Sequence, residues 1–515
     1  MKQKPDNTGK SQTVPTLFGQ SRIFLYAGLI VLFALGIGFR LLNLTNPPLD
    51  MHAWRQLPSA SFARGLYYQM LPQADPILQE KAINLASATT HAEPTITETL
   101  VALSYLVAGG EYLWIARLWT TLFWVIGGIA LFALVRKMTS VDGAMISLAY
   151  FLLLPFGNAT TRCFLPEPLM VMWIILALYA LYHWIENQSW KWTIATGVFL
   201  GLAVFTKVFS IFPLAPAFIL VNLATFGFRG TLTKLKFWVI VALAGIIPAA
   251  YYIFPNPGSG GGYLSTWVLP YLGRLKDISF YIGWLHALNG SFNLAIVLIA
   301  IASTLLLEKR WRAMCLGLWI GYGLLGMAVP ELIFSHMYYN LPLVAIVAIS
   351  LGAVSALALG KISVQGRLWR VLFLGVALVG MGYSVFMSRK DVMAVDYRAE
   401  PEKWRELASK IPDALTVGLT EEYGMLLNYY GWKSTIAYPY SFDQDMSRMA
   451  GHEFDVTEDN TEYFNSHIGR SGYFVITMLE ELEFQPYLKK ILYDNYPIYD
   501  QGDWYIIFDL TDPYE

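Results

Sequence analysis

The sequence is poor in charge and in cysteine. Only 14% of its 515 residues are Asp, Glu, Lys or Arg, and it has two cysteines, Cys163 and Cys315. A typical soluble domain is about 25% charged, and two cysteines cannot build a disulfide framework. The formal net charge of −1 gives no overall basic field of the kind that nucleic-acid binders show. A disulfide scaffold, a disordered chain and a DNA-binding protein are therefore excluded as first interpretations.

Apolar and aromatic residues are abundant instead. Hydrophobic residues make up 56% of the chain, the mean hydropathy is +0.45, and there are 17 Trp and 31 Tyr. Their distribution is uneven, because residues 388–515 carry 35 of the 73 charged residues and residues 1–387 carry the other 38. We expect a membrane domain over residues 21–387 and a soluble domain over residues 388–515.

The membrane part contains eleven apolar runs. About 20 apolar residues cross a bilayer as a helix, so these runs predict an all-α polytopic membrane bundle of about eleven transmembrane helices. The first run is long and no small-residue cleavage site follows it, so it is expected to be a retained span and not a signal peptide. The runs lie at 21–42, 113–135, 141–157, 166–185, 192–208, 211–228, 236–254, 290–307, 313–330, 338–359 and 368–387.

The distribution of Lys and Arg predicts the orientation. With residues 1–20 as a cytoplasmic tail, the cytoplasmic segments hold 16 of the 25 basic residues of the membrane part. The positive-inside rule then places the C-terminal domain on the extracytoplasmic side of the cell membrane. Cys163 falls near the outer side and Cys315 near the inner side, which excludes a disulfide between them.

Two outer loops are long, at 43–112 and 255–289. Residues 94–109 of the first are apolar but too few to span, and they favour a helix that lies in the membrane interface. The second loop begins with a glycine run at 255–263 that lacks the Gly-Lys-Ser/Thr ending of a phosphate loop. A flexible loop is the better interpretation of this run.

The C-terminal segment alternates helical and extended patterns, as a small α/β domain does. Helices are predicted at 402–410, 421–430 and 481–492, and strands at 415–419, 473–477 and 504–508.

Ionisable side chains gather at the predicted outer ends of the helices, where they are functional candidates by default. Carboxylates can act as a general base or bind a divalent cation. Basic and phenolic side chains can hold a phosphate by charge-assisted hydrogen bonds. Group transfer from a lipid-linked phosphate would use both the carboxylates and the phosphate-binding side chains. The candidate catalytic acids are Asp50, Glu93 and Glu167, and the candidate substrate-binding residues are His52, Arg55, Lys207, His336, Tyr338 and Tyr339.

Each candidate also has a structural interpretation. Asp50 suits the N-cap of a following helix. Glu93 and Glu167 stand at helix starts, where the helix dipole favours an acid. Lys207 could extend to the interface, and His336 with the tyrosines could form part of an aromatic belt.

The chain resembles the GT-C membrane glycosyltransferases, in the branch of protein mannosyltransferases and lipid A aminoarabinose transferases. The resemblance covers most of residues 20–390. The strings that carry it are Asp50-x-His52-x-Trp54-Arg55-Gln56, Glu93-Pro94, Arg117, Pro166-Glu167-Pro168-Leu-Met and His336-x-Tyr338-Tyr339-x-Leu-Pro342.

The resemblance implies an inverting sugar transfer from a polyprenyl-phosphate sugar to a protein, lipid or glycan acceptor outside the membrane. It assigns Asp50 to act as the base on the acceptor or to help position it, Glu93 and Glu167 as supporting acids, and Arg55, Lys207, His336 and Tyr338 or Tyr339 to the carrier phosphate. His52 could bind the phosphate, orient Asp50 or ligate a metal weakly. A divalent metal ion stays open as a cofactor, and no nucleotide cofactor is expected. Many members have two adjacent acids in the first loop, whereas Met51 follows Asp50 here.

Three other functions fit the sequence less well. A transporter or flippase for a lipid-linked or polysaccharide substrate should have ionisable groups near mid-span and repeated halves, and the charges here cluster at the outer edge. A polysaccharide ligase should have a late outer loop rich in Arg and His, but the 255–289 loop has only Arg274, Lys276 and His286. A receptor-like binding protein would leave the first-loop string unexplained.

Overall fold

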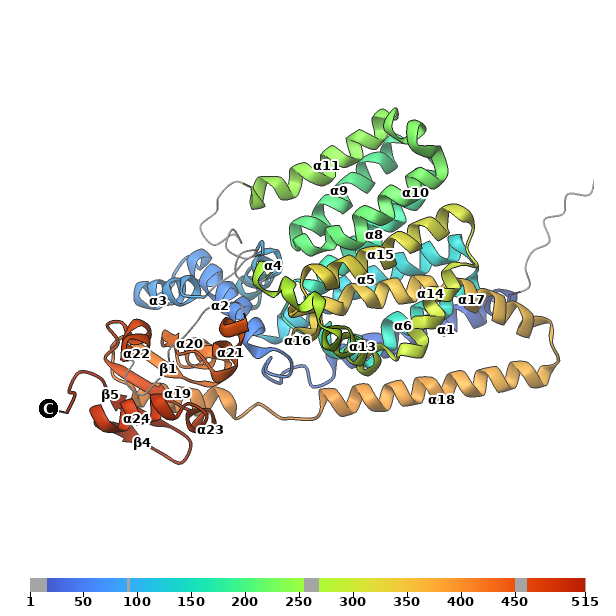
Figure 1. Cartoon of the computed structure of the whole chain (residues 1–515). Helices are drawn as coiled ribbons and strands as arrows, with labels where there is room; N and C mark the ends of the chain where they lie inside the picture. The colour runs from blue at the N-terminus through green and yellow to red at the C-terminus, as the bar shows by residue number, and fades with distance from the viewer. Residues whose placement is uncertain (1–15, 90–92, 254–267, 450–460, 515) are drawn as a thin grey trace, which may run out of the picture.

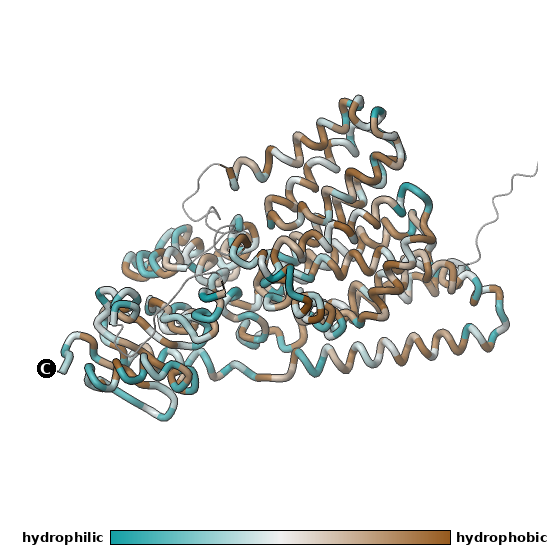
Figure 2. Tube along the Cα trace, in the orientation of Figure 1, coloured by the Kyte–Doolittle hydropathy of each residue, from teal (hydrophilic) through white to brown (hydrophobic). Residues whose placement is uncertain are grey.

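The protein consists of a long helical bundle with a small α/β unit at one end (Figure 1). The computed structural model describes residues 16–89, 93–253, 268–449 and 461–514. Apolar residues dominate the bundle, while the C-terminal unit is coloured largely as polar (Figure 2). This is the predicted architecture of a multi-pass membrane bundle followed by an α/β domain.

Each of the eleven predicted spans contains a helix. Among the described residues, seven helices are long and apolar enough to cross a membrane, or eight if a bent pair counts as one span, which is fewer than the eleven predicted. The helices in the runs at 141–157 and 192–208 are shorter than 18 residues. The helices are α1 (Arg22–Leu41), α5 (Trp114–Met138), α6 (Val141–Leu153), α8 (Glu167–Asn187), α9 (Trp190–Thr206), α10 (Ile211–Leu232), α11 (Leu235–Tyr252), α14 (Leu294–Thr304), α15 (Lys309–Ala328), α17 (Leu341–Val364) and α18 (Arg367–Val392).

Two of the predicted spans are not single straight helices. The run at 290–307 contains a corner, where α13 (Ile278–Phe292) and α14 meet at 92°. Asn293 turns the chain with φ 61°, and its side chain accepts a hydrogen bond from the N–H of Ala295 at 3.1 Å. The run at 141–157 is divided at Pro155, which opens a separate short helix, α7 (Pro155–Thr160), because proline starts a helix more readily than it continues one.

Small residues allow the helices of the bundle to approach closely. A methyl group added at Gly317 or Gly321 of α15 would collide with the backbone of α10. A methyl group at Gly143 of α6 would collide with the carbonyl of Gly352 on α17. Residues 341–353 of α17 are buried throughout. Close approach of small residues is the usual means by which membrane helices gain van der Waals contact.

The first outer loop is a helical layer at the end of the bundle. It contains α2 (Ala53–Met70), α3 (Pro76–Ser87) and α4 (Ile96–Ala108). The helix predicted at 94–109 is confirmed as α4, whereas α3 was not predicted. The Asp75 side chain accepts a hydrogen bond from the N–H of Ile77 at 2.8 Å and so caps α3. The glycine run predicted as a flexible loop lies outside the described residues.

Short elements connect several of these helices. They are η1 (Phe18–Gln20), η2 (Val208–Ser210), η3 (Leu269–Lys276), α16 (Leu332–Ser335) and η4 (Met337–Asn340).

The C-terminal unit is built on a five-stranded mixed sheet of order β2-β1-β3-β5-β4, in which β1 pairs in parallel with β2 and β3. The three predicted strands are confirmed as β1, β3 and β5, and β2 and β4 were missed because they are short and partly exposed. The elements are α19 (Glu400–Lys410), β1 (Thr416–Leu419), η5 (Glu421–Gly424), α20 (Met425–Tyr429), β2 (Thr435–Ala437), α21 (Ser441–Met449), α22 (Thr461–Ile468), β3 (Tyr473–Ile476), α23 (Leu479–Glu483), α24 (Pro486–Asn495), β4 (Ile498–Gln501) and β5 (Ile506–Asp509).

The C-terminal unit packs directly on α2. The Ser61 hydroxyl donates to Asn428 at 2.9 Å, and the Arg64 guanidinium donates to the carbonyl of Tyr429 at 2.6 Å. In Figure 1 the two lie together at the same end of the bundle, and α18 runs along the outside of the bundle toward this end. The first outer loop and the C-terminal unit therefore enclose one end of the membrane domain.

Candidate active site

The turn before α2 sets the position of the first candidates. His52 is the N-cap residue of α2 and has a left-handed conformation, φ 47°. Asp50 therefore does not cap this helix. The N–H of Trp54 instead donates to the carboxylate of Glu422 at 2.7 Å, so the cap comes from the C-terminal unit. Burial raises the pKa of Glu422, although the bond from Trp54 acts in the opposite direction.

Asp50 lies between two buried arginines. Its Oδ2 is 3.5 Å from a guanidinium nitrogen of Arg117 and 3.5 Å from one of Arg162. The same two guanidiniums donate to backbone carbonyls of residues 42–46. Burial lowers the pKa of Arg162 to about 10, assisted by Arg117 and opposed by Asp50. The arginines thus fix both the chain before Asp50 and its carboxylate.

The other two acids share one lysine. Lys207, at the end of α9, donates to Glu167 at the start of α8 and lies 3.3 Å from Glu93. Arg55 on α2 reaches both carboxylate oxygens of Glu93 at 3.2 Å. The side chain of Arg55 is 17% exposed and those of Glu93, Glu167 and Lys207 are 10% exposed or less, so pairing is needed to offset the cost of removing these charges from water.

Aromatic and imidazole rings form the next layer around Lys207. Its ammonium lies 5.0 Å from the ring centre of Tyr338 and 4.6 Å from that of Tyr339, within cation–π range. The rings of His52 and His336 stack at 5.9 Å. Burial lowers the pKa of both imidazoles, that of His336 to about 3, with additional lowering by His52 and Arg55. His336 is consequently neutral at physiological pH.

Eight of the nine predicted site residues therefore form one connected cluster, which we call the Lys207 cluster. Asp50 lies beside it: the side chain of Gln56, next to Arg55 in the sequence, donates to Asp50 at 3.4 Å. The Lys207 cluster consists of His52, Arg55, Glu93, Glu167, Lys207, His336, Tyr338 and Tyr339.

Three residues near the site were not among the sequence candidates. Arg162 is one of the two cations at Asp50. Glu422 caps α2, and the ring of Tyr423 lies 6.2 Å from that of Trp54. The Arg162 side chain could have been favoured from its place in the string before Glu167. No local signal connects residue 422 with residue 54.

The side chains around Asp50 do not fit a divalent cation. Metal ions of this kind require several oxygen or imidazole ligands, whereas the charged neighbours of Asp50 are the guanidiniums of Arg117 and Arg162. Over the residues that the structure describes, no group of three His, Cys, Asp or Glu side chains could hold a metal ion. The Asp50 carboxylate is thus already paired with two guanidinium groups.

Comparison with known proteins supports the resemblance seen in the sequence. Residues 92–252 match the family model described as dolichyl-phosphate-mannose-protein mannosyltransferase. This segment includes Glu93, Glu167 and Lys207. No curated protein matches the chain.

Solved structures match nearly the whole chain. ArnT from Cupriavidus metallidurans, bound to undecaprenyl phosphate, has a TM-score of 0.54 at 14% identity, with 94% of this chain and 98% of that chain covered. The oligosaccharyltransferase of Archaeoglobus fulgidus, in complex with Zn and sulfate, has a TM-score of 0.58 at 13% identity, with coverages of 87% and 68%. The fold is of the GT-C type.

A third GT-C structure matches a larger share of this chain. The archaeal oligosaccharyltransferase AglB from Archaeoglobus fulgidus, in complex with an inhibitory peptide and a dolichol-phosphate, has a TM-score of 0.56 at 14% identity and covers 97% of this chain and 77% of that chain. The predicted GT-C resemblance is confirmed, and it includes the C-terminal region.

Proposed function

We propose that this GT-C chain is a membrane glycosyltransferase that moves a sugar from a polyprenyl-phosphate donor to an acceptor on the extracytoplasmic face, with inversion at the anomeric carbon. The observation that carries the proposal is the Lys207 cluster next to Asp50 at one end of a membrane bundle. The family match over residues 92–252 and the lipid phosphates bound by two structural neighbours support it.

The charges of the site suit a phosphate. Three carboxylates, on Asp50, Glu93 and Glu167, face four cations. The cations are largely buried, where a phosphate interacts with them more strongly than in water. Arg55 and Lys207 supply the charge-assisted hydrogen bonds, and His336 adds a neutral imidazole. The four cations are Arg55, Arg117, Arg162 and Lys207.

The three acids differ in the exposure of their side chains, and this difference supports different roles for them. The side chain of Asp50 is 17% exposed, whereas that of Glu167 is 1% exposed and bound to Lys207. Asp50 can therefore meet an acceptor hydroxyl. Glu93 and Glu167 act as positioning residues, because each holds a cation that faces the carrier phosphate.

The proposed reaction is a single displacement. The acceptor hydroxyl loses its proton to the Asp50 carboxylate, and its oxygen attacks the anomeric carbon on the side opposite the phosphate. The bond between this carbon and the phosphate oxygen breaks, and the electron pair stays on the carrier phosphate. Arg55 and Lys207 stabilise that charge, so the leaving group requires no proton.

We assign the site to the extracytoplasmic side. Basic residues flank the turns at the opposite end of the bundle, such as Arg136 and Lys137 before α6 and Arg229 and Lys234 between α10 and α11. The positive-inside rule favours the cytoplasm for that end. The N-terminal residues 1–20 then belong to the cytoplasm and residues 388–515 to the exterior.

The test is Asp50→Asn in the full-length protein, assayed in membranes with a labelled polyprenyl-phosphate sugar. We expect transfer to fall by at least about a hundredfold, the loss typical of a removed general base, with normal amounts of folded protein. Asp75→Asn is the matched control, since Asn caps a helix as well as Asp. Near-normal transfer by Asp50→Asn would remove Asp50 from the catalytic role.

A further inference from the structure

Two cavities meet at Trp432, between the first outer loop and the C-terminal unit. The first has a volume of about 400 Å³ and lies against α2 and the start of α5. The second, of about 540 Å³, lies between α3 and the chain around β1. Trp432 lines both, and we refer to the two together as the Trp432 cavities. Their volumes are in the range of small-molecule sites.

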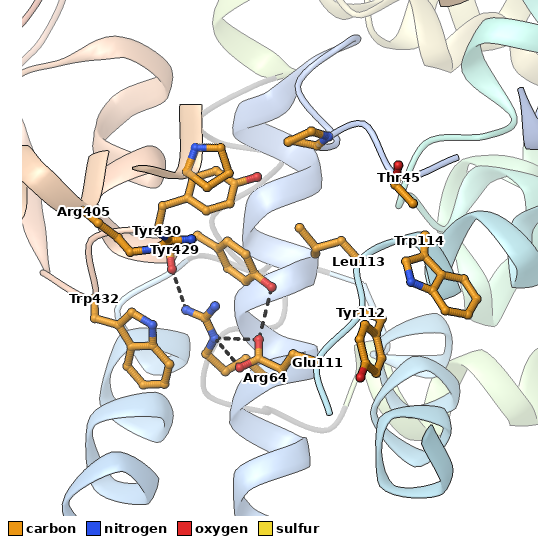
Figure 3. A pocket seen from close by; sticks show the side chains of 12 residues that line it. Thr45, Arg64, Glu111, Tyr112, Leu113, Trp114, Arg405, Tyr429, Tyr430 and Trp432 are labelled. Atoms are coloured by element: carbon orange, nitrogen blue, oxygen red, sulfur yellow. Dashed lines mark hydrogen bonds and ion pairs between the residues drawn. The ribbon is translucent and has the colours of Figure 1, made fainter. Parts of the chain in front are cut away.

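The first cavity combines flat aromatic faces with planar polar groups (Figure 3). At its centre Arg64 donates to Glu111 at 2.9 Å, and its guanidinium lies 3.8 Å from the ring centre of Tyr429 and 4.3 Å from that of Trp432. Tyr112 contributes a ring that is 43% exposed. Leu113 is the only aliphatic side chain in the lining apart from prolines.

Two details distinguish these cavities from ordinary packing gaps. The Tyr430 hydroxyl is buried without a hydrogen-bond partner among the described residues, although Tyr430 lines the first cavity. A buried hydroxyl of this kind normally has a partner. Trp432 adopts a left-handed conformation, φ 53°, which is a genuine outlier for a bulky residue. Strain of this kind persists where the surroundings require it, often at ligand sites.

One wall of the first cavity lies close to Asp50. Pro47 lines it, and the carbonyl of Pro47 accepts a hydrogen bond from Arg117 at 3.5 Å. The same guanidinium nitrogen of Arg117 lies 3.5 Å from Asp50. One guanidinium therefore separates the wall of the cavity from the proposed catalytic base.

We infer that the Trp432 cavities bind the acceptor, and that this acceptor is a glycan chain. This inference rests on the proposed function. A sugar ring presents C–H groups on its faces and hydroxyls on its edge. The aromatic faces of Trp432 and Tyr112 can pack against the C–H groups of a sugar face. Arg64, Glu111 and the Tyr430 hydroxyl can form hydrogen bonds with the sugar hydroxyls. Two cavities in succession accommodate more than one sugar ring. In the first cavity an apolar peptide side chain would find little aliphatic surface, whereas the second cavity also presents Ile77, Leu85 and Leu415.

The first experiment measures binding. Radiolabelled oligosaccharides, released by mild acid from envelope glycans of the source organism, are dialysed to equilibrium against full-length protein in lipid nanodiscs. We expect saturable binding that weakens about tenfold or more in Trp432→Asn, because a central tryptophan often dominates an interface. Asn tolerates the left-handed backbone. Trp432→Phe keeps a ring and should bind within about threefold of wild type.

The matched control is Phe484→Ala. Phe484 is a 72% exposed aromatic of the C-terminal unit that lines neither cavity, and its variant should bind the oligosaccharides normally. Thermal unfolding of each variant reports whether the fold is retained. If Trp432→Asn unfolds, Tyr112→Ala replaces it, since this partly exposed ring is expected to affect binding in the same direction.

The outcomes separate this inference from the proposed function. Absence of oligosaccharide binding by the wild type, or equal binding by folded Trp432→Asn and Tyr112→Ala, overturns the glycan site. Binding of a tryptic digest of envelope proteins that depends on Trp432, without binding of oligosaccharides, overturns it in favour of a peptide. A third outcome is that the wild type binds oligosaccharides through Trp432 but does not consume a polyprenyl-phosphate sugar. This outcome supports the glycan site and contradicts the proposed transferase.

Discussion

At the scale of residues, Lys207 is the centre of the account. Its ammonium is almost fully buried, and it is held by Glu167 and Glu93 below the rings of Tyr338 and Tyr339. A buried charge without a partner is far more costly than a buried pair. On the proposed function, this pairing would hold a cation for the carrier phosphate in a place that water hardly reaches.

Removing one partner of this pair should cost stability. For Glu167→Gln we expect a loss of about 3 kcal/mol in the free energy of unfolding, because Lys207 would lose its nearest counter-charge. The double variant Glu167→Gln/Lys207→Met should recover much of this stability but not sugar transfer. Thermal unfolding in detergent, together with transfer assays, measures both. A double variant that transfers sugar normally would contradict the role of Lys207.

Much of the site that Asp50 and the Lys207 cluster form could be predicted from the sequence. Asp50, Glu93, Glu167 and His336 stand in short polar strings at the ends of apolar runs, where an ionisable side chain has few structural reasons to occur. Glu422 and Trp432 could not be found this way. Their roles depend on how the C-terminal unit docks on α2, a contact between residues more than 350 positions apart in sequence.

At the scale of elements, apolar runs predict where helices lie but not where they bend. The run at 290–307 is continuous in composition, yet Asn293 takes a left-handed conformation and turns the chain by 92°. The bend depends on one residue. The long helix α18 is not interrupted: its 26 residues, about 39 Å at 1.5 Å per residue, are long enough to cross a bilayer.

The direction of α18 can be tested by fusion. A reporter joined after residue 394 should lie outside the cell, since α18 begins beside Lys361 and Arg367 on the predicted cytoplasmic side. Alkaline phosphatase should then be active and green fluorescent protein dark. A fusion after residue 365, before α18, is the matched control and should give the reverse pattern. The same pattern from both fusions would refute the assigned orientation.

At the scale of the whole molecule, the C-terminal unit completes the site from outside the bundle. It caps α2 through Glu422, and it supplies Tyr423 beside Trp54, which in turn lies 5.2 Å from His336. The GT-C matches cover this unit as well as the bundle. We therefore regard the bundle end, the first outer loop and the C-terminal unit as one functional assembly.

The most direct measurement of the central claim follows the lipid carrier. Purified full-length protein in liposomes is given a polyprenyl-phosphate sugar and envelope glycans, and the lipids are analysed by mass spectrometry. The account predicts that wild-type protein converts the donor to free polyprenyl phosphate, and that Asp50→Asn leaves it unchanged. A donor that stays intact with folded wild-type protein, or that is consumed equally by Asp50→Asn, would contradict the account.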